Sequence, residues 1–425
     1  MATEFERTFD AIWKMESGRV IASVAKLLRG DLGAAEEAAQ EAALSAWEHW
    51  SREGLPENPG AWLMTTARRR GIDALRRRGT LVISAADPNV LEARSSAQAD
   101  DMEEVDRILD DGIEDDLLRL IFATAHPRLG EEARGALTLR LVCGLTTEEI
   151  ARAFLTQEST IAQRIVRAKK TLGELDEPFE IPAGEALRER LDSVLEVIYL
   201  LFNEGYSATS GGDWMRPALC DEAIRLGRIL AARMKDEPEV HGLTALMELQ
   251  ASRMRARVDA SGQPILLLDQ DRGRWDQLLI RRGLAGLELA SRSGDHPGPF
   301  ELQAMIAACH ATAATAEETN WERIATLYGV LSAMTGSPVV ELNRAVAVAM
   351  ARGPADGLAI IDVLAEDGRL GEYHPLHAAR GDLLLRLERF SEAAAAFERA
   401  AQLAKNDRER ALLEKRAQSC LPPAG

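Results

Sequence analysis

Residues 58–79 read NPGAWLMTTARRRGIDALRRRG and predict one amphipathic helix of about five turns. Asn58 can cap its start, Pro59 fits the first helical position, and Gly79 suits its end. At about 100° per residue, one arc of this helix is apolar and is expected to face a core. That arc holds Leu63, Met64, Ala67, Gly71, Ile72 and Leu75.

The opposite arc of this helix combines an aromatic ring with several guanidinium groups. It carries Trp62, Arg69, Asp73, Arg76 and Arg77. The whole chain has a formal charge of -17, so a local cationic surface is out of character. Such a surface commonly binds phosphate and unstacked bases. A solvated face, on which Asp73 pairs with neighbouring arginines, would give the same pattern, and both interpretations remain open here.

A second segment, GLTTEEIARAFLTQESTIAQRIVRAKKTL at 144–172, predicts two helices around a short turn. Thr146 and Glu149 have the spacing of a capping box. The expected inward residues are Ile150, Ala151 and Phe154 on the first helix and Ile161, Ile165 and Leu172 on the second. The outer face of the second helix carries Ser159, Thr160, Gln163, Arg164, Arg167, Lys169 and Lys170. Polar residues near the start of such a helix can reach base edges while its basic end contacts phosphates.

The two segments together resemble the extracytoplasmic-function (ECF) group of bacterial sigma factors over roughly residues 5–177. The promoter-melting helix of that group commonly reads W-L-x-x-x-A-R-N-x-x-x-D-x-x-R-R, and here only Arg69 departs from the pattern. Leu155 stands where the group usually has Gly in the inter-helix turn. The resemblance implies that the downstream promoter element is bound by Trp62, Arg68, Arg69, Arg76 and Arg77. It implies that the upstream element is bound by Ser159, Thr160, Gln163, Arg164, Arg167 and Lys170.

A third match lies upstream, where residues 31–41 fit the pattern D-x-x-x-A-E-[DE]-x-x-Q-[ED]. The resemblance implies that core RNA polymerase is bound here by Asp31, Glu36, Glu37, Gln40 and Glu41. Helical spacing places an alanine-rich side, with Trp47 and Trp50, toward the core and leaves the acidic residues outside. An acidic helix face is also typical of a merely solvated surface.

Length and composition predict an all-α protein of several domains. The chain has 425 residues, only 5% aromatic residues, and no convincing run of alternating β-branched residues. We expect sigma region 2 at residues 1–80, an acidic linker at 81–114, a region 4 helix-turn-helix at 115–177, and a helical extension at 185–425. The N-terminus lacks the features of a secretory signal and no apolar run reaches membrane-spanning length, so a cytoplasmic location without membrane contact is expected.

The end of the extension shows an internal repeat typical of tetratricopeptide-like helical pairs. Small and large residues recur 36 positions apart, which predicts closely packed helix pairs. The two sets are Ala345, Gly357, Ile361 and Leu364, followed by Gly381, Ala393, Phe397 and Ala400.

No catalytic, cofactor or metal site is predicted. Cys143, Cys220, Cys309 and Cys420 have no CxxC spacing and are expected to be reduced and buried. The glycine-rich stretch at 202–214 lacks phosphate-loop spacing. His374 and His377 flank Pro375, which argues against a regular helix there, and no third ligand is evident.

The sequence therefore predicts a non-enzymatic transcription initiation factor that binds core RNA polymerase and promoter DNA. Its extension is expected to be regulatory and is a possible docking site for a regulatory protein. Two alternatives stay open: a helical-repeat interaction scaffold, and a helix-turn-helix regulator that binds operators without polymerase. The segment from Trp62 to Arg77 separates them, since an operator-binding protein does not need it.

Overall fold

The computed structural model describes residues 4–77, 116–154, 156–175, 177–207, 215–259, 263–293 and 296–420. These ranges are helical, apart from loops and one isolated bridge between Val258 and Pro264, which confirms the all-α prediction. The chain divides into two compact units, residues 1–197 and 198–425. The predicted acidic linker, Gly79, Leu155 and residues 208–214 of the glycine-rich stretch lie outside the described residues.

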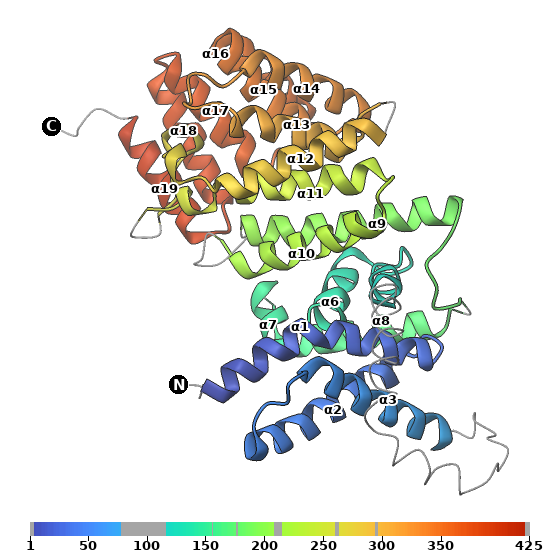
Figure 1. Ribbon diagram of the computed structural model, residues 1–425. Coiled ribbons are helices and arrows are strands. Elements are labelled where there is room, and N and C mark those ends of the chain that lie inside the picture. The colour runs from blue at the N-terminus through green and yellow to red at the C-terminus, as the bar shows by residue number, and fades with distance from the viewer. Residues whose placement is uncertain are drawn as a thin grey trace, which may run out of the picture. The chain divides into compact units, whose positions relative to one another are not determined.

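The first unit begins with a bundle of three mutually packed helices, α1 (Glu4–Leu27), α2 (Leu32–Glu53) and α3 (Pro59–Arg77) (Figure 1). The predicted cap of α3 is present, since Ala61 N donates to Asn58 Oδ1 at 3.0 Å. The predicted apolar arc of α3 faces the bundle, where Leu63, Met64, Ala67 and Gly71 are buried. A side chain at Gly71 would come within 3.1 Å of Val24 on α1, so glycine permits this close packing.

A helix-turn-helix domain follows the linker. It comprises a helix at residues 116–124, α6 (Glu131–Leu141), α7 (Thr147–Ala153) and α8 (Glu158–Gly173). The predicted capping box is formed, because Glu149 N donates to Thr146 Oγ1 at 3.1 Å and Thr146 N donates to Glu149 Oε2 at 2.9 Å. Ile161 and Ile165 of α8 are buried, as the packing stripe predicted.

Helix α9 (Glu185–Tyr206) crosses the division between the two units. Its first half packs on the helix-turn-helix domain, where Ser193 Oγ donates to the Ala125 carbonyl at 2.7 Å and Arg134 lies 3.4 Å from Glu196. The predicted extension therefore contributes its first residues, up to Val197, to the first unit.

The second unit is a succession of helices in which each packs against the next (Figure 1, yellow-green to red). They are α10 (Pro217–Arg233), α11 (Pro238–Ala251), α12 (Gln277–Ser293), α13 (Pro299–Ala311), α14 (Trp321–Thr335), α15 (Pro338–Arg352), α16 (Pro354–Asp367), α17 (His374–Arg386), α18 (Phe390–Leu403) and α19 (Asp407–Ser419). Three short 3-10 helices lie between α11 and α12: η1 (Met254–Ala256), η2 (Leu267–Asp269) and η3 (Arg272–Arg274).

The predicted repeat corresponds to two helix pairs, α15 with α16 and α17 with α18. A side chain at Gly357 would lie 2.4 Å from Ala349, and one at Gly381 would lie 2.9 Å from the Phe397 ring. The other repeat residues are also buried. Small residues therefore allow close approach in both pairs, on the second helix of one and on the first helix of the other.

Two further sequence predictions can be compared with these helices. His374 and His377 both lie on α17, so the prediction that they are not on a helix is wrong. Pro375 is accommodated because it occupies the first turn, where its missing N–H has no helical partner. The four cysteines are free and buried, as predicted. No group of potential metal ligands occurs among the described residues, and none of the helices placed there could cross a membrane.

Candidate promoter and polymerase interface

The outer face of α3 presents the predicted cations to solvent. Arg69, Arg76 and Arg77 are exposed. Arg76 Nη1 lies 3.5 Å from Asp73 Oδ1, and both side chains are more than half exposed, so this pair contributes little stability. These guanidinium groups are set apart by their grouping and not by an ion pair. Arg69, Arg76 and Arg77 all project from the last three turns of α3.

Trp62 and Arg68 are less exposed than the other predicted contacts on α3. Trp62 is half-buried, with its ring 5.5 Å from Trp50 and stacked at 5.9 Å on His49. Arg68 is also half-buried, and its Nε donates to Ser23 Oγ at 2.8 Å. Burial lowers the pKa of Arg68, while Asp116 acts in the opposite direction. Trp62 therefore forms the edge of the exposed face, whereas Arg68 fastens α3 to α1.

Helix α8 presents the predicted reading face to solvent. Its exposed residues are Ser159, Thr160, Gln163, Arg167 and Lys170. Arg164 is half-buried and lies 2.5 Å from Glu132 on α6, which holds its guanidinium near the domain surface. Val166 is 65% exposed on the same helix and was not predicted. An apolar residue outside the packing stripe was the available signal, since apolar contacts with thymine methyl groups are part of base reading.

The acidic face of α2 is only partly available to a partner. Glu37 and Gln40 are exposed and Glu41 is half-buried, while Asp31 accepts a hydrogen bond from Ala34 N at 2.9 Å and caps the helix. Glu36 was expected on the outside, but it is only 7% exposed. That expectation was wrong because helical periodicity does not reveal that a second domain packs on the same face.

The helix-turn-helix domain surrounds the Glu36 carboxylate with cations. Arg140 Nε of α6 donates to Glu36 at 2.6 Å, and Lys169 Nζ of α8 contacts its second oxygen. Gln40 Nε2 adds a hydrogen bond at 2.8 Å. Burial opposes ionisation of Glu36, but Lys169 and Arg140 outweigh it and lower the pKa of this carboxyl.

Other contacts join the three-helix bundle to the helix-turn-helix domain. Lys14 Nζ lies 2.7 Å from Glu149, and Lys26 Nζ lies 3.0 Å from the buried Asp116. Burial opposes the Lys14 to Glu149 pair, yet its hydrogen bond raises the pKa of Lys14 and lowers that of Glu149. At Gly18 the backbones meet so closely that a side chain would lie 2.4 Å from the Val142 carbonyl oxygen.

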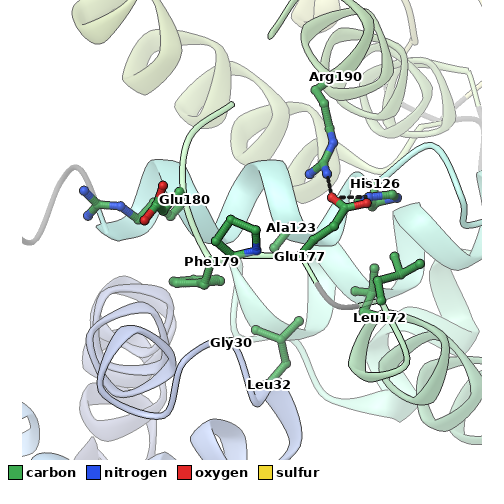
Figure 2. Close-up of a pocket in the computed structure, with 12 residues that line it drawn as sticks. Gly30, Leu32, Ala123, His126, Leu172, Glu177, Phe179, Glu180 and Arg190 are labelled. Atoms are coloured by element: carbon green, nitrogen blue, oxygen red, sulfur yellow. Dashed lines mark hydrogen bonds and ion pairs between the residues drawn. The ribbon is translucent and has the colours of Figure 1, made fainter. Parts of the chain in front are cut away.

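The chain after α8 covers the corner between α1 and α2 (Figure 2). Phe179 points toward Gly30, where an added side chain would lie 3.2 Å from Phe179 Cβ. Glu177 holds this segment by lying 3.3 Å from His126 Nε2 and by contacting Arg190. The residual pocket of about 50 Å³ holds little more than water, so we read this corner as a packing contact beside Asp31.

An apolar groove of about 360 Å³ runs between α1 and α2. Phe9, Trp13, Leu44 and Trp47 line it, next to Gln40. Leu44 is 66% exposed and Trp47 is 38% exposed, with the Trp47 ring 5.1 Å from Phe9. The prediction that Trp47 packs inward like Trp50 was therefore only partly right. The candidate polymerase surface combines acidic residues with an apolar groove that periodicity did not indicate.

Comparison with known proteins identifies the family. Residues 15–80 match Sigma-70 region 2, and residues 119–172 match Sigma-70 region 4. The ECF RNA polymerase sigma factor SigL of Mycobacterium tuberculosis is 31% identical over 159 residues, which are 37% of this chain and 82% of SigL. The chain belongs to the ECF sigma factor family. An ECF sigma factor is a transcription initiation factor rather than an enzyme.

The extension of this ECF sigma factor has relatives of its own. Residues 190–291 match a family described as a family of unknown function (DUF6596). A Rhizobium meliloti protein, "Uncharacterized protein R00370", is 45% identical over 383 residues, which are 90% of this chain and 89% of that protein. The combination of both sigma regions with the extension therefore occurs in another chain of similar length. No solved structure matches significantly.

Proposed function

We propose that this ECF sigma factor binds core RNA polymerase through α2, opens promoter DNA with α3 and reads the upstream element with α8. The exposed cationic face of α3 carries this proposal, since it projects from the helix that the family uses for melting. Within the described part of the chain, Asp73 is the one acidic side chain that pairs with Arg69, Arg76 or Arg77. The proposed domains are those expected from the sequence, residues 1–80, 115–177 and 185–425, with an acidic linker at 81–114. A cytoplasmic location is part of the proposal.

Transcription in vitro with sigma-free core polymerase tests this function. We expect the purified chain to start transcription at a cognate promoter and to bind the core enzyme before DNA is added. Tight binding to duplex DNA without polymerase, together with no initiation, would instead support an operator-binding regulator. Absence of both activities would support the interaction scaffold.

Gln163 and Lys170 are expected to play different parts on α8. Both are exposed, but Gln163 lies in the first half of the helix, where side chains reach base edges, and Lys170 lies in its last turns. Gln163→Ala should therefore change discrimination at one upstream position by about 1 to 3 kcal/mol, whereas Lys170→Ala should weaken all sequences alike. Binding of a randomised promoter library by the holoenzyme measures both effects. An unchanged profile for Gln163→Ala, or an altered one for Lys170→Ala, would contradict the assignment.

We infer in addition that the packing of the helix-turn-helix domain on α2 belongs to a closed form that must open for polymerase to bind. Glu36 is covered from the other domain, and the corner at Gly30 is covered from the segment after it. Glu37, Gln40, Leu44 and Trp47 remain exposed, so polymerase has an initial contact surface on the same helix. Opening would then release Glu36 from Arg140 and Lys169.

We propose that the extension regulates this sigma factor, and a truncation series tests whether it does. The fragment 1–197 keeps the first half of α9, whereas the fragment 1–180 loses it together with Ser193. The hydrogen bond from Ser193 to Ala125 and the Arg134 contacts would then be missing. We expect the shorter fragment to be less stable by about 1 to 3 kcal/mol in urea unfolding.

Fragment 1–197 should bind core polymerase and recognise promoters without normal control in cells. Transcription identical to that of the full chain, at rest and under stress, would exclude a regulatory extension.

A further inference from the structure

The second unit contains a partly open cavity that none of the proposed promoter or polymerase contacts uses. Its volume is about 180 Å³, and it lies between α11, the segments around η1 and η2, α13 and α14. A water molecule occupies about 30 Å³ in the liquid, so the space exceeds what one structural water fills. The match to the family of unknown function ends at residue 291, and the cavity lining extends past that point. Arg253 lies inside the matched range and His310 lies beyond it.

Several hydrogen-bonding groups around this cavity have no protein partner. Trp275 Nε1 and His310 Nδ1 are buried without a hydrogen bond within the described part of the chain. Within the same part of the chain, no carboxylate forms an ion pair with Arg253. The Arg253 guanidinium lies 5.7 Å from the centre of the Tyr206 ring. Buried donors without partners are costly, and native proteins usually satisfy them with water or a ligand.

Two arginines lie at or beside the cavity, Arg253 in its lining and Arg272 over the Trp275 ring. Glu317 and Glu318 act on Arg272 but are not lining residues. Arg272 is fixed in place, because it donates to the carbonyl oxygens of His310 at 2.7 Å and Ala313 at 2.8 Å and to Thr319 Oγ1 at 2.9 Å. Burial, followed by Arg253 and Arg272, lowers the pKa of His310 to about 4, so its imidazole is neutral at pH 7. Two cations beside a neutral imidazole favour an anion over a cation as occupant.

Gln250, Gln303 and Tyr328 also line the cavity, and Gln303 is already hydrogen-bonded to Tyr199 and Pro299. The other lining residues are apolar. They include Leu249, Leu267, Ile306 and Ala307, together with the indole of Trp275. A fully hydrated inorganic anion would leave these side chains without a partner. A ligand with one charged end and an apolar body would satisfy both parts of the cavity, as small-molecule sites generally do.

We propose that this cavity is a binding site for a small organic carboxylate, with its apolar body against Leu249, Leu267 and Ile306. The carboxylate would be held by Arg253, by the unpartnered Trp275 N–H and by His310 in the tautomer that carries its proton on Nδ1. The site lies entirely within the second unit. It does not depend on the proposed promoter and polymerase contacts, and it gives the extension a chemical ligand class.

Calorimetric titration of the full chain with benzoate, hexanoate and glutarate tests the site, with benzamide as the neutral counterpart of benzoate. At least one carboxylate should bind with a Kd on the order of 1 mM or tighter, and benzamide at least about tenfold more weakly than benzoate if benzoate is that ligand. Arg253→Gln should weaken carboxylate binding at least about tenfold, because it removes the charged donor. Arg255→Gln, an exposed arginine two residues away, is the matched control and should bind as the unaltered chain does.

Leu267→Trp provides a second variant that keeps every charge and fills the cavity from a half-buried position on η2. It should abolish binding while circular dichroism stays unchanged, even if Arg253→Gln proves unstable. Three results would overturn the site: no binding of any carboxylate at about 10 mM, equal binding of benzoate and benzamide, or unaltered binding by a folded Leu267→Trp chain. None of these results depends on polymerase or DNA, so they are distinguishable from failure of the proposed function.

Discussion

Replacing Arg76 and Arg77 together by alanine is expected to abolish promoter opening while the protein still folds and still binds core polymerase. Both guanidinium groups are exposed on the last turn of α3, so their loss exposes no core residue. Each charge-assisted contact with DNA contributes about 1.5 to 3 kcal/mol, so losing two should slow initiation at least about 100-fold. Permanganate reactivity of promoter thymines measures the opening directly.

The matched control for this double substitution is Arg281→Ala with Arg282→Ala. These neighbouring arginines are exposed on α12 in the second unit, so they give the same change in net charge without touching α3. The control should open the promoter normally. Normal thymine reactivity in the Arg76 and Arg77 variant would refute a melting role for this face, and equal loss in both variants would point to net charge alone.

Replacing Arg140 and Lys169 together by alanine is expected to strengthen binding to core polymerase. The substitutions leave Glu36 as a buried carboxylate without its cations, which costs about 3 to 5 kcal/mol in the closed form. Separation of the helix-turn-helix domain from the three-helix bundle would expose Glu36 to water and uncover the acidic face of α2. If the open form is the one that binds, its larger population should raise the apparent affinity about tenfold or more.

Lys170→Ala is the matched control for the second prediction, because Lys170 adjoins Lys169 but is exposed and lies 3.8 Å from Glu174 instead. It should leave the affinity for core polymerase unchanged in the absence of DNA. Fluorescence titration measures the affinity, and spin labels on α2 and α8 of the full chain measure the separation of the domains. Separation of the domains without tighter binding would show that the closed form does not restrain polymerase binding.

The local sequence by itself determined where α3 and α7 begin and how they are capped. Asn58 and Pro59 start α3, and the Thr146 to Glu149 box starts α7, because capping uses only groups within one turn of the chain. The buried arc of α3 and the repeat at Gly357 and Gly381 also followed from periodicity. The family followed from two motifs in order, which need no contact between distant residues.

Only the tertiary structure decided which predicted site residues are free. Glu36 and Glu37 are adjacent and chemically alike, yet Glu36 is enclosed by Arg140 and Lys169 and Glu37 is exposed. The cavity beside Arg253 was equally invisible, because its walls come from residues up to 79 positions apart, Leu249 to Tyr328. Periodicity reports the face that one helix turns toward its own bundle. Burial by a second domain, and the space left between packed helices, depend on long-range packing that no local pattern records.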